Sequence, residues 1–259
     1  MKYSYAELAG MIDHSLLHPT MTDAELEAGC KLAAKYKTAS VCIKPYAVKM
    51  AATLLKGTGV QVGAVVGFPH GGSTTEVKRY ETEVACRDGA TEIDMVINIG
   101  KALSGDWAFV AEDIRVVTQE AHKHGAIVKV IFENDFLNTD ALKIKLCEIC
   151  EAAGADFVKT STGYGFVKGA DGKYSYKGAT EEDLKLMRAH CSNKVQVKAA
   201  GGIRDLDVLI RARELGTARV GATATATMLE DYLKRAATPE TKPDAGAKPK
   251  TGQLGTGGY

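Results

Sequence analysis

The chain has 259 residues and a formal net charge of +1, from 33 basic and 32 acidic side chains. A charge this close to zero argues against a nucleic-acid-binding protein, which normally carries a basic face. No apolar run reaches the roughly 18–20 residues that a membrane span requires.

Short β-branched runs alternate with longer amphipathic stretches along most of the chain. Strands are predicted at 11–14, 40–43, 61–66, 92–97, 127–132, 156–160, 195–198 and 219–221. Helices are predicted at 23–36, 46–55, 74–88, 106–124, 139–153, 181–190, 205–215 and 224–235. This alternation indicates parallel βαβ units. Eight units predict a closed (β/α)8 TIM barrel over residues 1–236. A doubly wound open sheet is the alternative, but its Gly-rich dinucleotide turn is missing from the sequence.

Two segments depart from the alternation. Residues 164–179 follow the sixth predicted strand and hold four glycines, three tyrosines and three lysines. Active sites of barrels lie at the carboxyl ends of the strands, so we expect a small hairpin or a lid there. Residues 237–259 are rich in Pro, Gly, Thr and Lys. Such a composition buries too little apolar surface to offset its ordering entropy, which predicts a flexible tail.

The amino-terminal segment lacks the apolar stretch of a secretory signal, and the six cysteines are scattered. Both features predict a cytoplasmic protein. Cys147 and Cys150 form a C-x-x-C pair inside a helical pattern. No second cysteine pair stands at zinc spacing, so core packing is the simpler interpretation. The histidine pairs also supply too few convergent ligands, and we expect no metal site.

Three charged residues interrupt predicted strands that should be almost wholly apolar, because parallel barrel strands are buried on both faces. These residues are Asp94, Lys159 and Lys198. The two-residue period of a strand points them toward the barrel axis and their neighbours toward the helices. A structural Lys–Asp pair with a spare lysine is one interpretation. Because buried ion pairs stabilise poorly after desolvation, we favour a catalytic cluster.

Lysine attacks a carbonyl only as the free amine, and an unperturbed lysine is neutral about once in 2,500 molecules at pH 7. Burial and a neighbouring cation both lower the pKa of a lysine. Lys198 would supply that cation to Lys159, and Asp94 would move protons, directly or through a water. Together they predict a Schiff-base site. A protonated imine withdraws electrons from the adjacent carbon–carbon bond, so neither a metal nor a cofactor is required.

Gly-rich segments follow the last three predicted strands, where barrels commonly bind phosphate through backbone N–H groups. The candidate phosphate-binding residues are Thr160, Gly163, Gly201, Gly202, Gly221 and Thr223. One such loop is a weak signal, but three at successive strand ends are moderately specific.

Five motifs together resemble the deoxyribose-phosphate aldolase family, in the right order from about residue 8 to residue 235. They are Ile-Asp-His-Ser-Leu-Leu (12–17), Val-Cys-Ile-Lys-Pro (41–45), Glu-Ile-Asp-Met-Val (92–96), Lys-Thr-Ser-Thr-Gly (159–163) and Val-Lys-Ala-Ala-Gly-Gly-Ile-Arg (197–204). The resemblance implies a class I aldolase on a (β/α)8 barrel. Such an enzyme cleaves 2-deoxyribose 5-phosphate to glyceraldehyde 3-phosphate and acetaldehyde.

The resemblance also implies a role for each matching position. Lys159 forms the Schiff base, Lys198 lowers its pKa and takes part in proton transfer, and Asp94 is the proton donor and acceptor. Asp13 and Cys42 match polar positions that line the pocket, although inert packing is an equal interpretation for Cys42. The only partners implied are small phosphosugars and aldehydes, and a homo-oligomer stays open.

The sequence departs from the family in two places. Residues 164–179 form a longer connection than the family's short Gly-rich one, and Ala224 replaces a residue that often carries a hydroxyl in the phosphate loop. Some family members end in a tyrosine that reaches the active site, so the terminal Tyr259 becomes a fourth catalytic candidate. Two alternatives stay open: another Schiff-base aldolase or transaldolase, and a non-catalytic phosphosugar-binding barrel.

Overall fold

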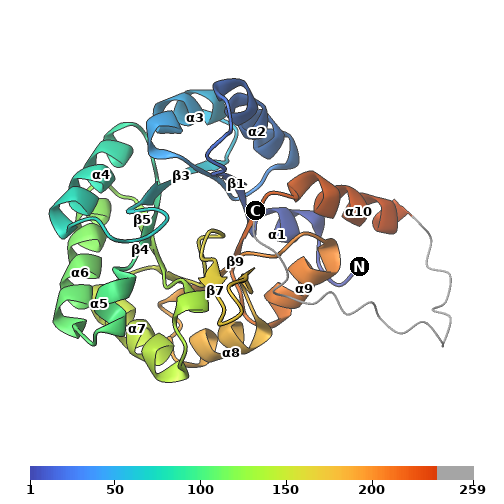
Figure 1. Cartoon of the computed structure of the whole chain (residues 1–259). Helices are drawn as coiled ribbons and strands as arrows, with labels where there is room; N and C mark the ends of the chain where they lie inside the picture. The colour runs from blue at the N-terminus through green and yellow to red at the C-terminus, as the bar shows by residue number, and fades with distance from the viewer. Residues whose placement is uncertain (238–259) are drawn as a thin grey trace, which may run out of the picture.

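The computed structural model describes residues 1–237, and the predictions for the tail and for Tyr259 fall on residues outside this range. Eight parallel strands close into a barrel in the order β1-β10-β9-β6-β5-β4-β3-β2, inside a ring of helices (Figure 1). The (β/α)8 prediction is therefore confirmed. The last helix continues to Ala237, one residue beyond the predicted boundary of the barrel.

The barrel strands are β1 (Ile12–Leu16), β2 (Ser40–Ile43), β3 (Gln61–Val66), β4 (Glu92–Val96), β5 (Ile127–Ile131), β6 (Phe157–Lys159), β9 (Gln196–Ala200) and β10 (Arg219–Ala222). The helices are α1 (Tyr5–Ala9), α2 (Asp23–Tyr36), α3 (Val48–Leu55), α4 (Thr75–Arg87), α5 (Ile99–Leu103), α6 (Trp107–Lys123), α7 (Asp140–Ala153), α8 (Glu181–Ala189), α9 (Leu206–Glu214) and α10 (Thr225–Ala237). Two 3-10 turns, η1 (Pro45–Ala47) and η2 (Asn134–Phe136), follow strands β2 and β5.

Helices α1 and α5 were not predicted, because five residues are too few to show an amphipathic period. Helix α1 nevertheless has a capping box, in which Ser4 accepts a hydrogen bond from the backbone N–H of Glu7 and Glu7 accepts one from that of Ser4. The S-x-x-E spacing was readable as a helix start. The ring of Tyr5 packs edge-on against Tyr232, which fixes α1 on α10.

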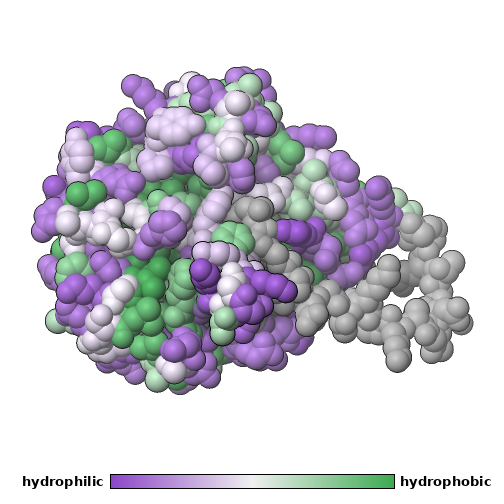
Figure 2. Space-filling model, in the orientation of Figure 1, coloured by the Kyte–Doolittle hydropathy of each residue, from purple (hydrophilic) through white to green (hydrophobic). Residues whose placement is uncertain are grey.

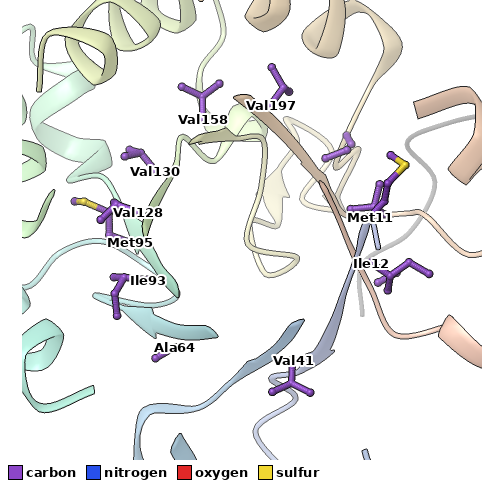
Figure 3. Packing of buried hydrophobic residues seen from close by; sticks show 14 of the residues in the cluster. Met11, Ile12, Val41, Ala64, Ile93, Met95, Val128, Val130, Val158 and Val197 are labelled. Carbon is purple, nitrogen blue, oxygen red and sulfur yellow. The ribbon is translucent and has the colours of Figure 1, made fainter. Parts of the chain in front are cut away.

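The apolar residues of the barrel strands point outward to the helices. Ile93, Met95, Val158 and Val197 are buried in the main core and point away from the barrel axis, as predicted (Figure 3). Since successive side chains of a strand face opposite sides, the charged residues between them point into the barrel. Figure 2 shows hydrophilic residues along much of the rim of the molecule.

The segment between β6 and α8 forms a hairpin, as predicted. Its strands β7 (Val167–Lys168) and β8 (Tyr174–Ser175) pair antiparallel, and in the view of Figure 1 strand β7 projects onto the area enclosed by the helices. No helix within residues 1–237 is long and apolar enough to span a membrane.

Candidate active site

Strands β4, β6 and β9 bring Asp94, Lys159 and Lys198 together inside the barrel. In the register of the sheet, Lys159 of β6 stands opposite Lys198 of β9. The Nζ atoms of both lysines lie 2.7 Å from Oδ2 of Asp94 on β4. All three side chains are buried. One carboxylate oxygen therefore contacts both amines, which is the cluster that the strand pattern predicted.

The barrel interior holds further charged groups that the sequence reasoning missed. Lys129 of β5 is fully buried, and its Nζ lies 3.0 Å from Asp94 Oδ1 and 2.5 Å from a carboxylate oxygen of Glu92. Arg219 of β10 donates to the other carboxylate oxygen of Glu92 at 2.8 Å. The signal was present, because Lys129 interrupts the apolar strand Ile-Val-Lys-Val-Ile just as Lys159 interrupts its own.

The ion-paired side chains of this interior include one more cation than anion. With all side chains ionised, four cations face three anions; they are Lys129, Lys159, Lys198 and Arg219 against Asp13, Glu92 and Asp94. An unbalanced buried charge is costly. Loss of one proton from Lys159 leaves three cations against three anions, which removes the imbalance.

The surroundings of Lys159 lower the pKa of its ammonium group. Burial is the main cause, and the positive charge of Lys198 adds to it, whereas Asp94 opposes both by stabilising the ammonium. Burial penalises the charged form because a low-dielectric interior solvates it poorly. The role predicted for Lys198 as a neighbouring cation is consistent with this direction, although burial contributes more.

Lys198 itself stays protonated. Burial alone would lower its pKa, but the carboxylates of Asp13 and Asp94 outweigh burial and hold it well above the usual range. Its Nζ lies 2.6 Å from Asp13 Oδ2. Burial would raise the pKa of Asp94, yet three lysines hold it well below the usual range. Asp94 is therefore an anion in the resting site and starts as a proton acceptor.

Asp13 and Cys42 lie on neighbouring strands at the same cluster. Asp13 contacts Lys198 and Lys129, so it acts through those lysines. The Sγ atom of Cys42 lies 3.8 Å from Asp94 Oδ2. Burial, assisted by Asp94, raises the pKa of Cys42 to about 11. Cys42 is consequently a neutral thiol at neutral pH. It lines the interior both as an apolar side chain and as a weak hydrogen-bond donor to Asp94.

Four of the candidate phosphate residues line one cavity of about 120 Å³: Gly201, Gly202, Gly221 and Thr223. Arg204 also lines it, which adds a guanidinium group to the candidate phosphate site. Thr160 and Gly163 do not line this cavity. The Thr160 hydroxyl instead donates to the carbonyl of Ala200 and accepts from its N–H, both at 3.0 Å, and so joins the ends of β6 and β9.

A larger cavity of about 640 Å³ lies elsewhere on the surface, between η1 and α4. Tyr46, Phe68 and Tyr80 line it, and none of the three central charged residues does. Size is the usual guide to a binding site, but this cavity, although larger than the one beside Gly201, is lined by none of the three central charged residues. The barrel interior holds the perturbed titratable groups, which makes it the candidate active site.

Comparison with known proteins decides the family. The model of the DeoC/LacD family of aldolases matches residues 8–234. The chain belongs to the DeoC/LacD family of aldolases. A deoxyribose-phosphate aldolase of Rhodopirellula baltica is 50% identical over 92% of this chain and 94% of its own length. One of Aciduliprofundum boonei is 46% identical over 86% of this chain and 96% of its own length. The resemblance drawn from the five motifs is confirmed.

Solved DeoC/LacD structures share the fold. A putative deoxyribose-phosphate aldolase from Coccidioides immitis superposes with a TM-score of 0.81 at 34% identity, covering 89% of this chain and 87% of that one. A deoxyribose phosphate aldolase from Aeropyrum pernix, described as tetrameric, has a TM-score of 0.78 at 30% identity and covers 90% of this chain and 93% of that one. This chain is thus similar to DeoC/LacD aldolases in sequence and in fold.

One buried carboxylate of this DeoC/LacD aldolase escaped the sequence reasoning. Glu133 follows β5 and adopts a left-handed backbone conformation, with φ of 59°. Its carboxylate accepts hydrogen bonds from the backbone N–H and the hydroxyl of Thr162. Burial nevertheless raises its pKa to about 7, so Glu133 titrates near neutral pH.

Glu133→Gln should change how stability depends on pH. Glu133 binds its proton more tightly in the native protein than in the unfolded chain. Protonated Glu133 therefore adds to the free energy of unfolding below about pH 4.5, and this stabilisation is lost as pH rises through 7. The uncharged amide of the variant has no such loss. Between about pH 5 and about pH 8, the free energy of unfolding of the variant should rise relative to wild type by about 2–3 kcal/mol, measured by urea unfolding. Glu148→Gln, on the exposed face of α7, is the control for replacing a carboxylate by an amide. A difference between Glu133→Gln and wild type that does not change with pH would contradict the assignment.

The C-x-x-C pair and His122 of this DeoC/LacD aldolase have structural contacts. Cys147 and Cys150 are buried in the hydrophobic core, as predicted. His122 hydrogen-bonds Asp156 at 2.8 Å. Within the described part of the chain, no group of three or more His, Cys, Asp or Glu side chains is arranged to hold a metal ion.

Proposed function

We propose that this DeoC/LacD aldolase reversibly cleaves 2-deoxy-D-ribose 5-phosphate to D-glyceraldehyde 3-phosphate and acetaldehyde through a Schiff base on Lys159. The observation that carries the proposal is the buried contact of Lys159 with Asp94, beside a protonated Lys198. Its pKa is lowered while that of Lys198 is raised. The fully buried cluster has one amine suited to attack and two charged groups suited to assist it.

The first half of the reaction joins the sugar to the enzyme. The lone pair of Lys159 Nζ attacks C1 of the open-chain aldehyde, and the carbonyl oxygen takes a proton from solvent to give a carbinolamine. The proton that the nitrogen releases to Asp94 is then passed to the same oxygen, which leaves as water and leaves a protonated imine. Asp94 Oδ2, 2.7 Å from Nζ, takes up the proton that the attacking nitrogen releases and stabilises the iminium charge.

The second half breaks the carbon–carbon bond. The C3 hydroxyl gives up its proton to Asp94, directly or through a water, and the electrons of the C2–C3 bond move to the iminium nitrogen. C3 becomes the aldehyde of glyceraldehyde 3-phosphate, and an enamine stays on Lys159. Protonation of the enamine at C2 and hydrolysis then release acetaldehyde and the free amine. The charged Lys198 stabilises the anionic carboxylate through these transfers.

The phosphate group fits the cavity lined by Gly201, Gly202, Gly221 and Thr223. Glycines allow an anion to approach backbone N–H groups closely, and Arg204 supplies positive charge. We retain Thr160 and Gly163 as candidates, with Thr160 acting through the strand ends that it joins. Asp13 and Cys42 border the same interior from β1 and β2.

Donor profiling tests this function against the other Schiff-base aldolases. Glyceraldehyde 3-phosphate is incubated with acetaldehyde, glycolaldehyde or dihydroxyacetone, and the products are separated by chromatography. Acetaldehyde should give the fastest condensation, and the product should be cleaved again by the enzyme. Preference for dihydroxyacetone would favour a transaldolase-like enzyme. Binding of the phosphosugar without any condensation would favour the non-catalytic barrel.

Tyr259 remains a proposed catalytic residue, and it lies outside the described residues. A terminal phenol at the site would pass a proton to or from the enamine carbon. Tyr259→Phe should therefore slow exchange of solvent deuterium into acetaldehyde at least several-fold, measured by proton NMR, because the phenyl ring has no exchangeable proton. Trapping of the Schiff base and the unfolding midpoint should stay unchanged. Equal exchange rates would remove Tyr259 from the mechanism.

The remaining expectations concern the setting of the enzyme. All six cysteines are in the described range and none is in a disulfide, which supports the proposed cytoplasmic location. The tetrameric Aeropyrum pernix neighbour supports a proposed homo-oligomer, which light scattering after size-exclusion chromatography would test. We retain the division into a barrel, residues 1–236, and a tail, residues 237–259, as a proposal.

A further inference from the structure

The segment from Thr162 to Gly178 leaves the barrel after β6, forms the β7–β8 hairpin and returns to α8. In the view of Figure 1 the hairpin projects onto the area enclosed by the ring of helices. Both ends of this segment are held by side chains from one short turn, which follows β5 and contains Glu133 and Asp135. The two carboxylates therefore define where a connection of seventeen residues begins and ends.

Glu133 holds the first end. Its two carboxylate oxygens lie 3.2 and 3.3 Å from the backbone nitrogen of Thr162, and one of them also accepts from the Thr162 hydroxyl. That hydroxyl oxygen accepts from the N–H of Tyr164 at 2.9 Å. A Cβ atom on Gly165 would lie only 2.6 Å from Glu133 Cδ. The segment that begins at Thr162, three residues after Lys159, thus packs directly against the Glu133 carboxylate.

Asp135 holds the second end and connects it to the phosphate cavity. Its Oδ1 accepts from the N–H of Lys177 at 2.7 Å, and its Oδ2 accepts from that of Gly178 at 2.9 Å. Gly178, at φ of +70°, packs so closely on Gly201 that a Cβ would lie 2.8 Å from the Gly201 carbonyl oxygen. The next N–H, of Ala179, donates to that same carbonyl at 3.2 Å.

We propose that Glu133 and Asp135 are positioning residues, a carboxylate clamp, that hold the ends of the hairpin segment and through Gly178 set Gly201 in the phosphate cavity. The inference rests on the proposed function, because it assigns that cavity to the phosphate of the substrate. The clamp acts on recognition of the phosphorylated end of the sugar rather than on the carbon–carbon bond.

The clamp residues are costly to the fold, which argues against incidental packing. Glu133 is buried and adopts a backbone conformation that side-chain-bearing residues rarely adopt, and such strain persists only where the surroundings impose it. The charged groups that act on Glu133 are Asp135 and Lys159; those that act on Asp135 are Asp183 and Lys177. A neutral, unstrained residue would cost less if this turn only filled space.

Asp135→Asn tests the clamp, because the amide keeps one acceptor and turns a donor toward the other N–H. The readout is kcat/KM for 2-deoxyribose 5-phosphate divided by kcat/KM for unphosphorylated 2-deoxyribose. We expect this ratio to fall by about tenfold, the size of one lost hydrogen bond to a carboxylate. The fall should come from a higher KM for the phosphorylated sugar, with kcat for either sugar within about twofold of wild type.

Asp183→Asn is the matched control. Asp135 and Asp183 both line a separate cavity of about 520 Å³. The side chain of Asp183 pairs with Lys143 and accepts no hydrogen bond from Lys177 or Gly178. Its ratio should match wild type. Glu133→Gln offers a second variant should Asp135→Asn fold poorly, with the same expected loss of phosphate preference. The clamp would be overturned if every clamp variant that folds kept the wild-type ratio of kcat/KM values. It would also be overturned if Asp183→Asn lowered that ratio as much as the clamp variants do. An inactive wild-type enzyme would instead overturn the proposed function.

Discussion

Lys159→Ala is expected to lower kcat by more than about three orders of magnitude and to abolish trapping of acetaldehyde by borohydride. The reason lies in the other interior lysines. Carboxylates hold the pKa values of Lys129 and Lys198 above the usual range. Even an unperturbed lysine is neutral only about once in 2,500 molecules at pH 7. Neither lysine can therefore replace the neutral amine that Lys159 supplies.

The measurement is intact-mass spectrometry after borohydride reduction, together with a coupled assay for glyceraldehyde 3-phosphate. Lys159→Arg should fail equally, because a guanidinium stays protonated and forms no imine. Lys145→Ala, which removes an exposed lysine of α7, should trap and turn over as wild type does. A two-carbon adduct on Lys159→Ala would place the nucleophile elsewhere, with Lys198 as the first candidate to map by peptide sequencing.

The arrangement of the barrel was predictable because its strands and helices obey local rules. Alternating β-branched and amphipathic runs predicted all eight barrel strands; β2 and β3 have the predicted bounds, and the ends of the others differ by one or two residues. The differences of two residues are at the carboxyl ends of β1 and β9. Strand β1 was predicted at 11–14 but spans Ile12–Leu16, since its buried residues include Asp13, His14 and Ser15 and interrupt the apolar pattern.

The central lysines were predictable because a charge inside an apolar strand is a local anomaly that a period of two assigns to one face. Lys129 shows the same anomaly and was overlooked. Arg219, by contrast, stands at the start of β10, where a charged residue is unremarkable, and only the closed barrel brings it to Asp13 and Glu92. The register of the barrel, rather than any local pattern, determines that contact.

The carboxylate clamp was harder to predict from the sequence. Asp135 and Gly178 are more than forty residues apart, and an acidic residue after a strand is ordinary in a turn. Their contact depends on how the hairpin folds back over the strand ends. No periodicity encodes that path. The candidate phosphate glycines were easier, because barrels recurrently place such loops after the last strands.

Lys198→Leu should lower kcat/KM at neutral pH and shift the rise of its pH profile to higher pH. The variant leaves three cations, Lys129, Lys159 and Arg219, among the three interior carboxylates. Charge balance, which in wild type favours the neutral amine of Lys159, now favours its ammonium form. Removing the cation also removes a contribution that lowers the pKa of Lys159. As pH is raised toward the new pKa of Lys159, the fraction of neutral amine and the activity should both rise by up to about tenfold for each pH unit.

Asp94→Asn provides the opposite case in the same cluster. It removes the carboxylate that raises the pKa of Lys159, so the amine should stay neutral to lower pH while proton transfer is lost. Its kcat should fall at every pH without recovery in alkali, and the substrate should still bind. The pH profiles of Lys198→Leu and Asp94→Asn thus distinguish two defects. In the first variant Lys159 is protonated at neutral pH, and in the second the proton transfer itself is lost. A wild-type pH profile for Lys198→Leu would show that burial alone keeps Lys159 neutral and that Lys198 serves only to hold Asp13 and Asp94.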